Sequence, residues 1–149
     1  MYQKIDLDYF WRTFEQILRE HGEPYKIIHE KSGKQTHYAN VNKLRPINSN
    51  CVDISLVRRK NFLRVGLYII DRYSSIGQHI LANRENINRE LSFAPQWEKG
   101  EKNPNTLRVI VKFPIDDHTC RELINEAFPY IEEFIKVAGK YGKREFFDF

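Results

Sequence analysis

The side chains that could perform chemistry do not fall into the spacings that metal sites and catalytic sites need. None of the five histidines lies three or four residues from another, and Cys51 and Cys120 are far apart. There is no paired-ligand zinc motif, no glycine-rich phosphate loop and no Gly-x-Ser-x-Gly elbow. The carboxylates Glu132 and Glu133 fall on the expected solvent face of a helix. We therefore expect no catalytic residue, no metal and no cofactor.

A metal-dependent nuclease is the enzyme class that the order of elements would best suit. Such enzymes hold Mg²⁺ with a carboxylate on one strand and an (Asp/Glu)-x-Lys triplet on the next. Asp53 lies in a suitable strand, but no lysine has Asp or Glu two positions before it. The partner strand, residues 62–68, contains no acidic residue. We expect a protein that is not an enzyme.

Composition and charge set the class of protein. The 149 residues are 41% hydrophobic and 30% charged, which is typical of one soluble globular domain. No run approaches the ~20 apolar residues of a membrane span, and Met1–Asp6 lacks the apolar stretch of a secretory signal. We expect a cytoplasmic protein with no membrane partner, and two cysteines that are buried thiols. The net charge of +4 makes nucleic acid a candidate partner.

Hydrophobic periodicity predicts one α+β domain over residues 1–149, in the order α-β-β-β-α-β-β-α, with a largely antiparallel sheet packed by helices. Residues 31–50 are expected to form a long loop, and the alternative is a loop that includes one irregular strand. The last helix is expected to start near Asp116 and Asp117 and to kink at Pro129. The other expected elements are a helix at 7–21, a strand at 25–30, a hairpin at 51–69 turning at Lys60-Asn61, a helix from Ser74 or Ser75 to Leu91, and strands at 93–98 and 107–113.

The positive charge is concentrated in the first hundred residues. Lysines plus arginines exceed acidic residues by 2 in residues 1–50 and by 3 in 51–100, whereas residues 101–149 carry −1. Basic side chains interleaved with an aromatic ring suit phosphate contacts with base stacking. The alternative is that lysines and asparagines simply populate loops. The candidate nucleic-acid contacts are Lys31, Lys34, Tyr38, Lys43, Arg45, Arg58, Arg59 and Lys60.

Two further surfaces are candidates for binding. On the open side of the predicted hairpin, alternation places Asp53, Ser55, Arg64 and Tyr68 on one face, where a cross-strand pair of Asp53 with Arg64 is the simplest structural role. Residues 142–149 form an aromatic tail. Its phenylalanines either dock into the same chain or contact a protein partner or a second copy; they are Phe146, Phe147 and Phe149.

Three segments resemble one family: the Phe-Trp helix around Tyr9–Phe14, the strand Phe62–Ile69 and the Trp-bearing segment Phe93–Trp97. They are similar to a bacterial domain of unknown function, often found C-terminal to PD-(D/E)XK nuclease-like domains and also free-standing. The likeness covers nearly the whole chain, mostly through fold-forming hydrophobic residues. The sequence departs in having no nuclease-like domain and in having Asn86-Ile87-Asn88 where an acidic residue is expected. The resemblance implies a context of DNA defence or restriction and supplies no catalytic residue.

The order of elements also resembles secretion-chaperone-like folds, which dimerise and bind partner peptides, although those proteins are usually acidic. The sequence thus leaves two functions open. The first is a non-catalytic binding or accessory domain in a DNA-associated or restriction-like system, with nucleic acid as partner. The alternative is a dimeric protein-interaction module that uses the sheet face or the Phe-rich C-terminus.

Overall fold

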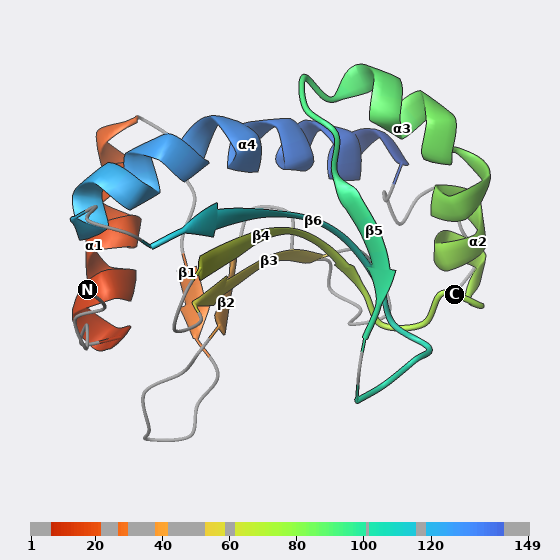
Figure 1. The fold of residues 1–149 in the computed structure, drawn as a ribbon, viewed down its shortest axis with the longest axis horizontal. Coiled ribbons are helices and arrows are strands. Elements are labelled where there is room, and N and C mark those ends of the chain that lie inside the picture. Colours follow the sequence, from red (N-terminus) through yellow and green to blue (C-terminus); the bar gives the residue numbers. More distant parts are fainter. Residues whose placement is uncertain are drawn as a thin grey trace.

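An antiparallel sheet and the helices packed on it form the part of the chain that the computed structural model describes (Figure 1). The described residues are 7–21, 27–29, 38–41, 53–58, 62–100, 102–115 and 119–141. For the strands before residue 59, only the backbone pairing is described. Within these residues the sheet has six strands, in the order β1-β2-β3-β4-β6-β5. The predicted α+β class with an antiparallel sheet packed by helices is confirmed.

The elements follow the predicted order closely, with the irregular strand of the 31–50 segment present as β2. They are α1 (Leu7–Glu20), β1 (Ile27–His29), β2 (Tyr38–Val41), β3 (Asp53–Arg58), β4 (Phe62–Ile69), α2 (Ser75–Ala82), α3 (Arg84–Glu90), β5 (Gln96–Lys99), β6 (Leu107–Pro114) and α4 (Cys120–Tyr141).

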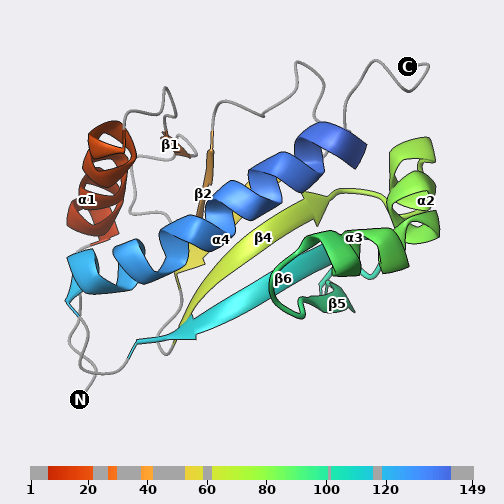
Figure 2. The ribbon, with the colours of Figure 1, turned by 90° about the horizontal axis from the view of Figure 1, so that it is seen from above.

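The core lies between the sheet and the long helix α4, which crosses one face of the sheet in Figure 2. The apolar stripe of α1 is fully buried, as its three- and four-residue spacing predicts. At the end of α1, Arg121 of α4 donates a 2.6 Å hydrogen bond to Glu20, and the ring of His21 stacks on Phe128 with centroids 3.8 Å apart. These contacts fasten α1 to the first half of α4.

The helix α4 begins at Cys120, later than the expected start near Asp116 and Asp117, and a capping box lies at its first turn. The backbone N–H of Glu122 donates to the Thr119 hydroxyl, and the backbone N–H of Thr119 donates to the Glu122 carboxylate, each at 3.2 Å. Asp116 and Asp117 lie outside the described residues. From Cys120, whose side chain is half-buried, the helix continues through Pro129 to Tyr141.

The helix predicted from Ser74 to Leu91 is two helices. The Ser74 hydroxyl caps α2 by accepting from the Gly77 N–H at 3.1 Å. At Asn83 the backbone leaves helical geometry (φ −102°, ψ 17°), and its side-chain amide donates to the His79 carbonyl at 2.9 Å. Asn83 therefore ends α2, because its side chain bonds a carbonyl at the end of that helix.

The position of Glu133 on the helix suggested a solvated side chain, but the carboxylate forms hydrogen bonds within the protein. It accepts hydrogen bonds from the backbone N–H of Ser92 at 2.8 Å and from the Ser92 hydroxyl at 2.6 Å. This carboxylate thus joins the segment that follows α3 to α4.

Backbone register determines which residues of the sheet are neighbours. Asp53 lies opposite Tyr68, whereas Arg64 lies opposite Val57, so the predicted direct cross-strand pair of Asp53 with Arg64 is wrong. The register of the β3–β4 hairpin places these two residues four positions apart along the strands, and side-chain pairing is strongest between directly opposed residues.

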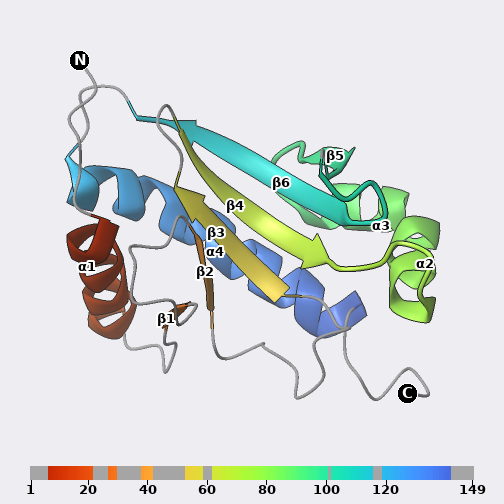
Figure 3. The same ribbon diagram turned by 90° about the horizontal axis from the view of Figure 1, so that it is seen from below.

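The two faces of the sheet differ in what covers them. The sheet is arched, with α4 along its convex side in Figure 1. Figure 3 shows β3, β4 and β6 in front of α4, with none of the described helices over the concave side.

At Gly66, in the middle of β4, an added Cβ would lie 2.1 Å from the Val109 carbonyl oxygen. Glycine therefore permits the close approach of β4 to β6.

Candidate functional site

Polar side chains gather on the concave face because successive side chains of β4 and β6 point to opposite faces of the sheet. Leu63, Val65 and Leu67 of β4 are fully buried on the helix side. The intervening residues face the other way. Register then places Arg64 beside Lys112 and Tyr68 beside Arg108.

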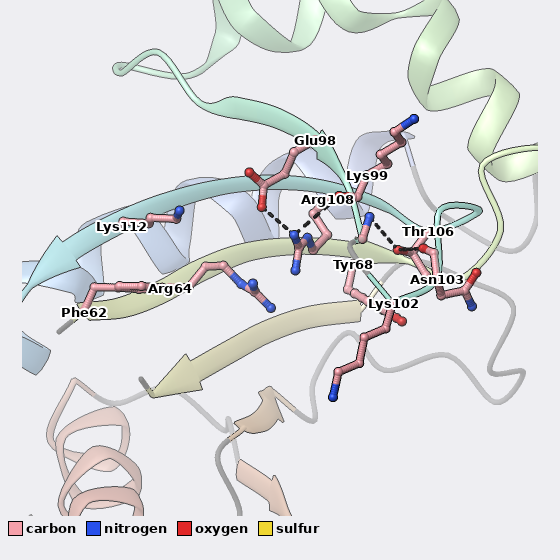
Figure 4. A pocket seen from close by; sticks show the side chains of 11 residues that line it. Phe62, Arg64, Tyr68, Glu98, Lys99, Lys102, Asn103, Thr106, Arg108 and Lys112 are labelled. Carbon is pink, nitrogen blue, oxygen red and sulfur yellow. Dashed lines mark hydrogen bonds and ion pairs between the residues drawn. The ribbon is translucent and has the colours of Figure 1, made fainter. Parts of the chain in front are cut away.

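These residues line an open pocket with a volume of about 590 Å³ (Figure 4). In that view Phe62, Arg64 and Lys112 lie at one end, Arg108 and Glu98 lie between, and Lys102 and Asn103 lie at the other end. The ammonium group of Lys99 points away from the pocket. The complete lining is Phe62, Arg64, Tyr68, Glu98, Lys99, Gly100, Lys102, Asn103, Thr106, Arg108 and Lys112.

Arg108 forms an ion pair within the pocket, and its side chain is mostly buried. Its guanidinium lies 2.7 Å from the Glu98 carboxylate, and the two side chains are 15% and 31% exposed. A longer hydrogen bond of 3.5 Å reaches the Lys99 carbonyl. Within the described residues, the buried Nε of Arg108 has no hydrogen-bond partner. The pair is thus well fixed, while one of its donors is unsatisfied.

At the basic end of the pocket, Arg64 and Lys112 lie with the aromatic ring of Phe62. The Lys112 ammonium lies 5.0 Å from the centroid of the half-buried Phe62 ring, within cation–π range. Lys112 is exposed, so its charge is also available to a ligand.

Hydrogen bonds join several residues of the loop that carries Lys102. The Thr106 hydroxyl, on a residue that is 2% exposed, donates to the Asn103 carbonyl at 2.8 Å and accepts from the Gly100 N–H at 3.1 Å. The Asn103 side chain accepts from the Asn105 N–H at 3.2 Å. These bonds satisfy the N–H groups of Gly100 and Asn105 and the carbonyl of Asn103 within the loop between β5 and β6.

The lining is mainly cationic and polar. It contains one carboxylate and neither His nor Cys, and its buried hydroxyl, on Thr106, is already hydrogen-bonded. Among the residues whose structure is described, no three His, Cys, Asp or Glu side chains form a group that could hold a metal ion. In the same part of the chain, no helix is long and apolar enough to span a membrane.

The residues predicted to contact nucleic acid are only partly placed. Tyr38 begins β2 and Arg58 ends β3. The register of the sheet pairs Tyr38 with Val57, Val57 with Arg64, and Arg64 with Lys112. The backbone of Tyr38 therefore lies in the same cross-strand row as Arg64 and Lys112. The other candidates lie outside the described residues: Lys31, Lys34, Lys43, Arg45, Arg59, Lys60 and the tail residues Phe146, Phe147 and Phe149.

Sequence reasoning missed Glu98, Lys102, Arg108 and Lys112 as site residues. The signal for two of them was present, because Arg108 and Lys112 occupy the polar positions of an alternating strand. What was lacking was the pairing of β6 with β4, which places these two residues next to Tyr68 and Arg64.

A second polar cluster, away from the pocket, joins α3 to the end of α4. Glu90 accepts hydrogen bonds from the ammonium of Lys140 and, at 2.9 Å, from the hydroxyl of Tyr141. The bond from Lys140 lowers the pKa of Glu90 and raises that of Lys140. Burial, followed by the bond to Glu90, raises the pKa of Tyr141. The cluster acts as a structural clamp.

The fold is therefore an α+β domain with an open, mainly basic sheet face. No protein-family model matches the sequence, and no curated protein matches it. Among solved structures, the chain is similar to YbjN from E. coli, described as "a putative transcription regulator", with a TM-score of 0.53 and 15% sequence identity. The likeness covers 94% of this chain and 96% of YbjN, and at this identity it shows the fold alone.

Proposed function

We propose that this protein is a non-catalytic binding protein that holds a single-stranded nucleic acid on the concave face of its sheet. The observation that carries the proposal is the pocket lining, in which Arg64, Lys102, Arg108 and Lys112 accompany two aromatic residues. Proteins that bind single strands combine a positively charged groove with aromatic rings on which bases stack. Both features are present on one face here.

The shape of the site favours a single strand over a duplex. The aromatic residues Phe62 and Tyr68 are half-buried in a recess rather than raised on a ridge. Unpaired bases can enter such a recess and stack, whereas bases inside a duplex keep their faces covered.

The wider role rests on less direct support. YbjN is described as "a putative transcription regulator", and a nucleic-acid partner is compatible with that role. The sequence resemblance to a domain that accompanies nucleases supports an accessory role in a DNA-associated or restriction-like system. Both contexts remain proposals for this chain.

Fluorescence polarisation tests the proposal with labelled 12-nucleotide single-stranded DNA, single-stranded RNA and the matching duplex. We expect the single strands to bind more tightly than the duplex at ~50 mM salt and to weaken at ~200 mM. Absence of binding at ~50 mM would refute the proposal. Equal binding of an acidic peptide of matched charge, or dimerisation in sedimentation that blocks the oligonucleotide, would favour the protein-interaction module.

A further inference from the structure

The ion pair of Arg108 with Glu98 lies within the basic pocket. The pair has no net charge, whereas the other charged residues of the lining are positive. Resting on the proposed function, we infer that this pair reads a nucleobase and that the base it selects is guanine. The ends of the pocket then hold the flanking phosphates.

A phosphate is a poor occupant for the centre of the pocket. The Glu98 carboxylate is 2.7 Å from the Arg108 guanidinium and offsets its charge, so a phosphodiester that approached Arg108 would also meet a negative group. Lys112 and Lys102 are exposed and lie on either side of the pair in Figure 4. Phosphates are accordingly attracted to the two ends, and the centre is left for an uncharged group.

The pair presents donors and an acceptor side by side. Glu98 is 31% exposed, and among the described residues its carboxylate has Arg108 as its one ion-pair partner, so lone pairs of the carboxylate remain available. Guanine is the one common base whose Watson–Crick edge carries two adjacent donors, N1–H and N2–H₂, with the acceptor O6 beside them. A carboxylate can accept from both donors while an arginine donates to the acceptor groups of guanine. Uracil, cytosine and adenine each offer the carboxylate a single donor group with at least one acceptor next to it.

Two observations around the pair support a base at this position. Tyr68 lies directly opposite Arg108 in the β4–β6 register and lines the same pocket, which places an aromatic side chain beside the pair. The buried Nε of Arg108 has no partner within the described part of the chain. An unsatisfied buried donor costs stability, so it is more often retained where a residue serves binding.

The test uses uridine 9-mers of single-stranded RNA whose central nucleotide is guanosine, inosine, adenosine or uridine. Inosine lacks only the N2 amine of guanine. We expect the wild-type protein to bind the guanosine oligomer roughly tenfold more tightly than the adenosine and uridine oligomers, with inosine between them. Glu98→Gln, which keeps the size of the side chain, should bind all four within about twofold. The control Glu132→Gln, on an exposed residue of α4, should keep the wild-type preference.

Equal binding of the four oligomers by the wild-type protein would overturn the inference while leaving the proposed function intact. Retention of the guanosine preference by Glu98→Gln would also overturn it, because the preference would then have another source. If none of the 9-mers binds at ~50 mM salt, the proposed function itself fails.

Discussion

Lys112 lies at the basic end of the pocket, where its removal should weaken nucleic-acid binding without disturbing the fold. Its ammonium is exposed and lies 5.0 Å from the centroid of the Phe62 ring, on the face of the sheet away from α4. Lys112→Gln removes one positive charge and keeps an unbranched side chain. The matched control is Lys136→Gln, which removes the same charge from an exposed position on α4.

The magnitude follows from the number of phosphate contacts. Arg64, Lys102 and Lys112 supply three, since Glu98 offsets Arg108. At a slope of about −0.7 per contact for a single strand, log K should fall with log salt with a slope of about −2. A rise from ~50 to ~200 mM salt then weakens wild-type binding about 20-fold. For Lys112→Gln two contacts remain, so the slope becomes about −1.4 and the loss about sevenfold.

Fluorescence polarisation with a 12-nucleotide single strand at four salt concentrations gives these slopes, and thermal unfolding checks that both variants fold. Lys136→Gln should keep the wild-type slope. The reasoning is refuted if Lys112→Gln and Lys136→Gln give the same slope, because the charge on the concave face would then matter no more than any other surface charge.

Three further predictions concern the stability of the fold. Gly66→Ala should lower the free energy of unfolding in urea by about 1–3 kcal/mol, because its Cβ would lie 2.1 Å from a backbone oxygen of Val109; an unchanged denaturation midpoint would show that β4 has room to move. Thr119→Ala removes the hydroxyl of the capping box and should cost about 1 kcal/mol, and Thr119→Ser should recover most of it; equal stability of the two variants would contradict the role of the cap. The bond to Lys140 lowers the pKa of Glu90 in the folded state. The stabilising effect of Glu90 is therefore present at neutral pH and is lost as the pH falls below the ordinary glutamate pKa of about 4.3, which applies to the unfolded chain. The wild-type advantage over Glu90→Gln in thermal unfolding should therefore shrink between pH 7 and pH ~3, and a constant difference would argue against the clamp.

Local patterns predicted most of the elements because each depends on neighbours in the chain. The apolar spacing of α1, the alternation of β4 and the apolar face of α4 appear in the structure as predicted. The errors fall where a side chain changes the backbone locally. Asn83 ends α2 through a bond to the His79 carbonyl, and the Thr119 cap lies at a start of α4 that is later than the one expected near Asp116 and Asp117.

The candidate site was only partly predictable. Arg64 and Tyr68 were correctly placed together on the open side of the hairpin, since alternation within one strand is a local property. Glu98, Arg108 and Lys112 joined them only through the pairing of β6 with β4 and β5. Two helices separate β4 from β5 and β6 in the sequence, so no local pattern records the register of β4 with β6.

By itself, the sequence determined that this is an α+β protein without a recognised catalytic motif and with an excess of positive charge, because composition and periodicity are sums over near neighbours. It did not determine where that charge is useful. Only the tertiary structure brought Lys112, Arg108 and Lys102, from a segment with no net positive charge, onto one concave face with Arg64 and Tyr68. The physical reason is that antiparallel register places residues from distant strands side by side, and the strength of a binding site depends on distances in space rather than on separation in sequence.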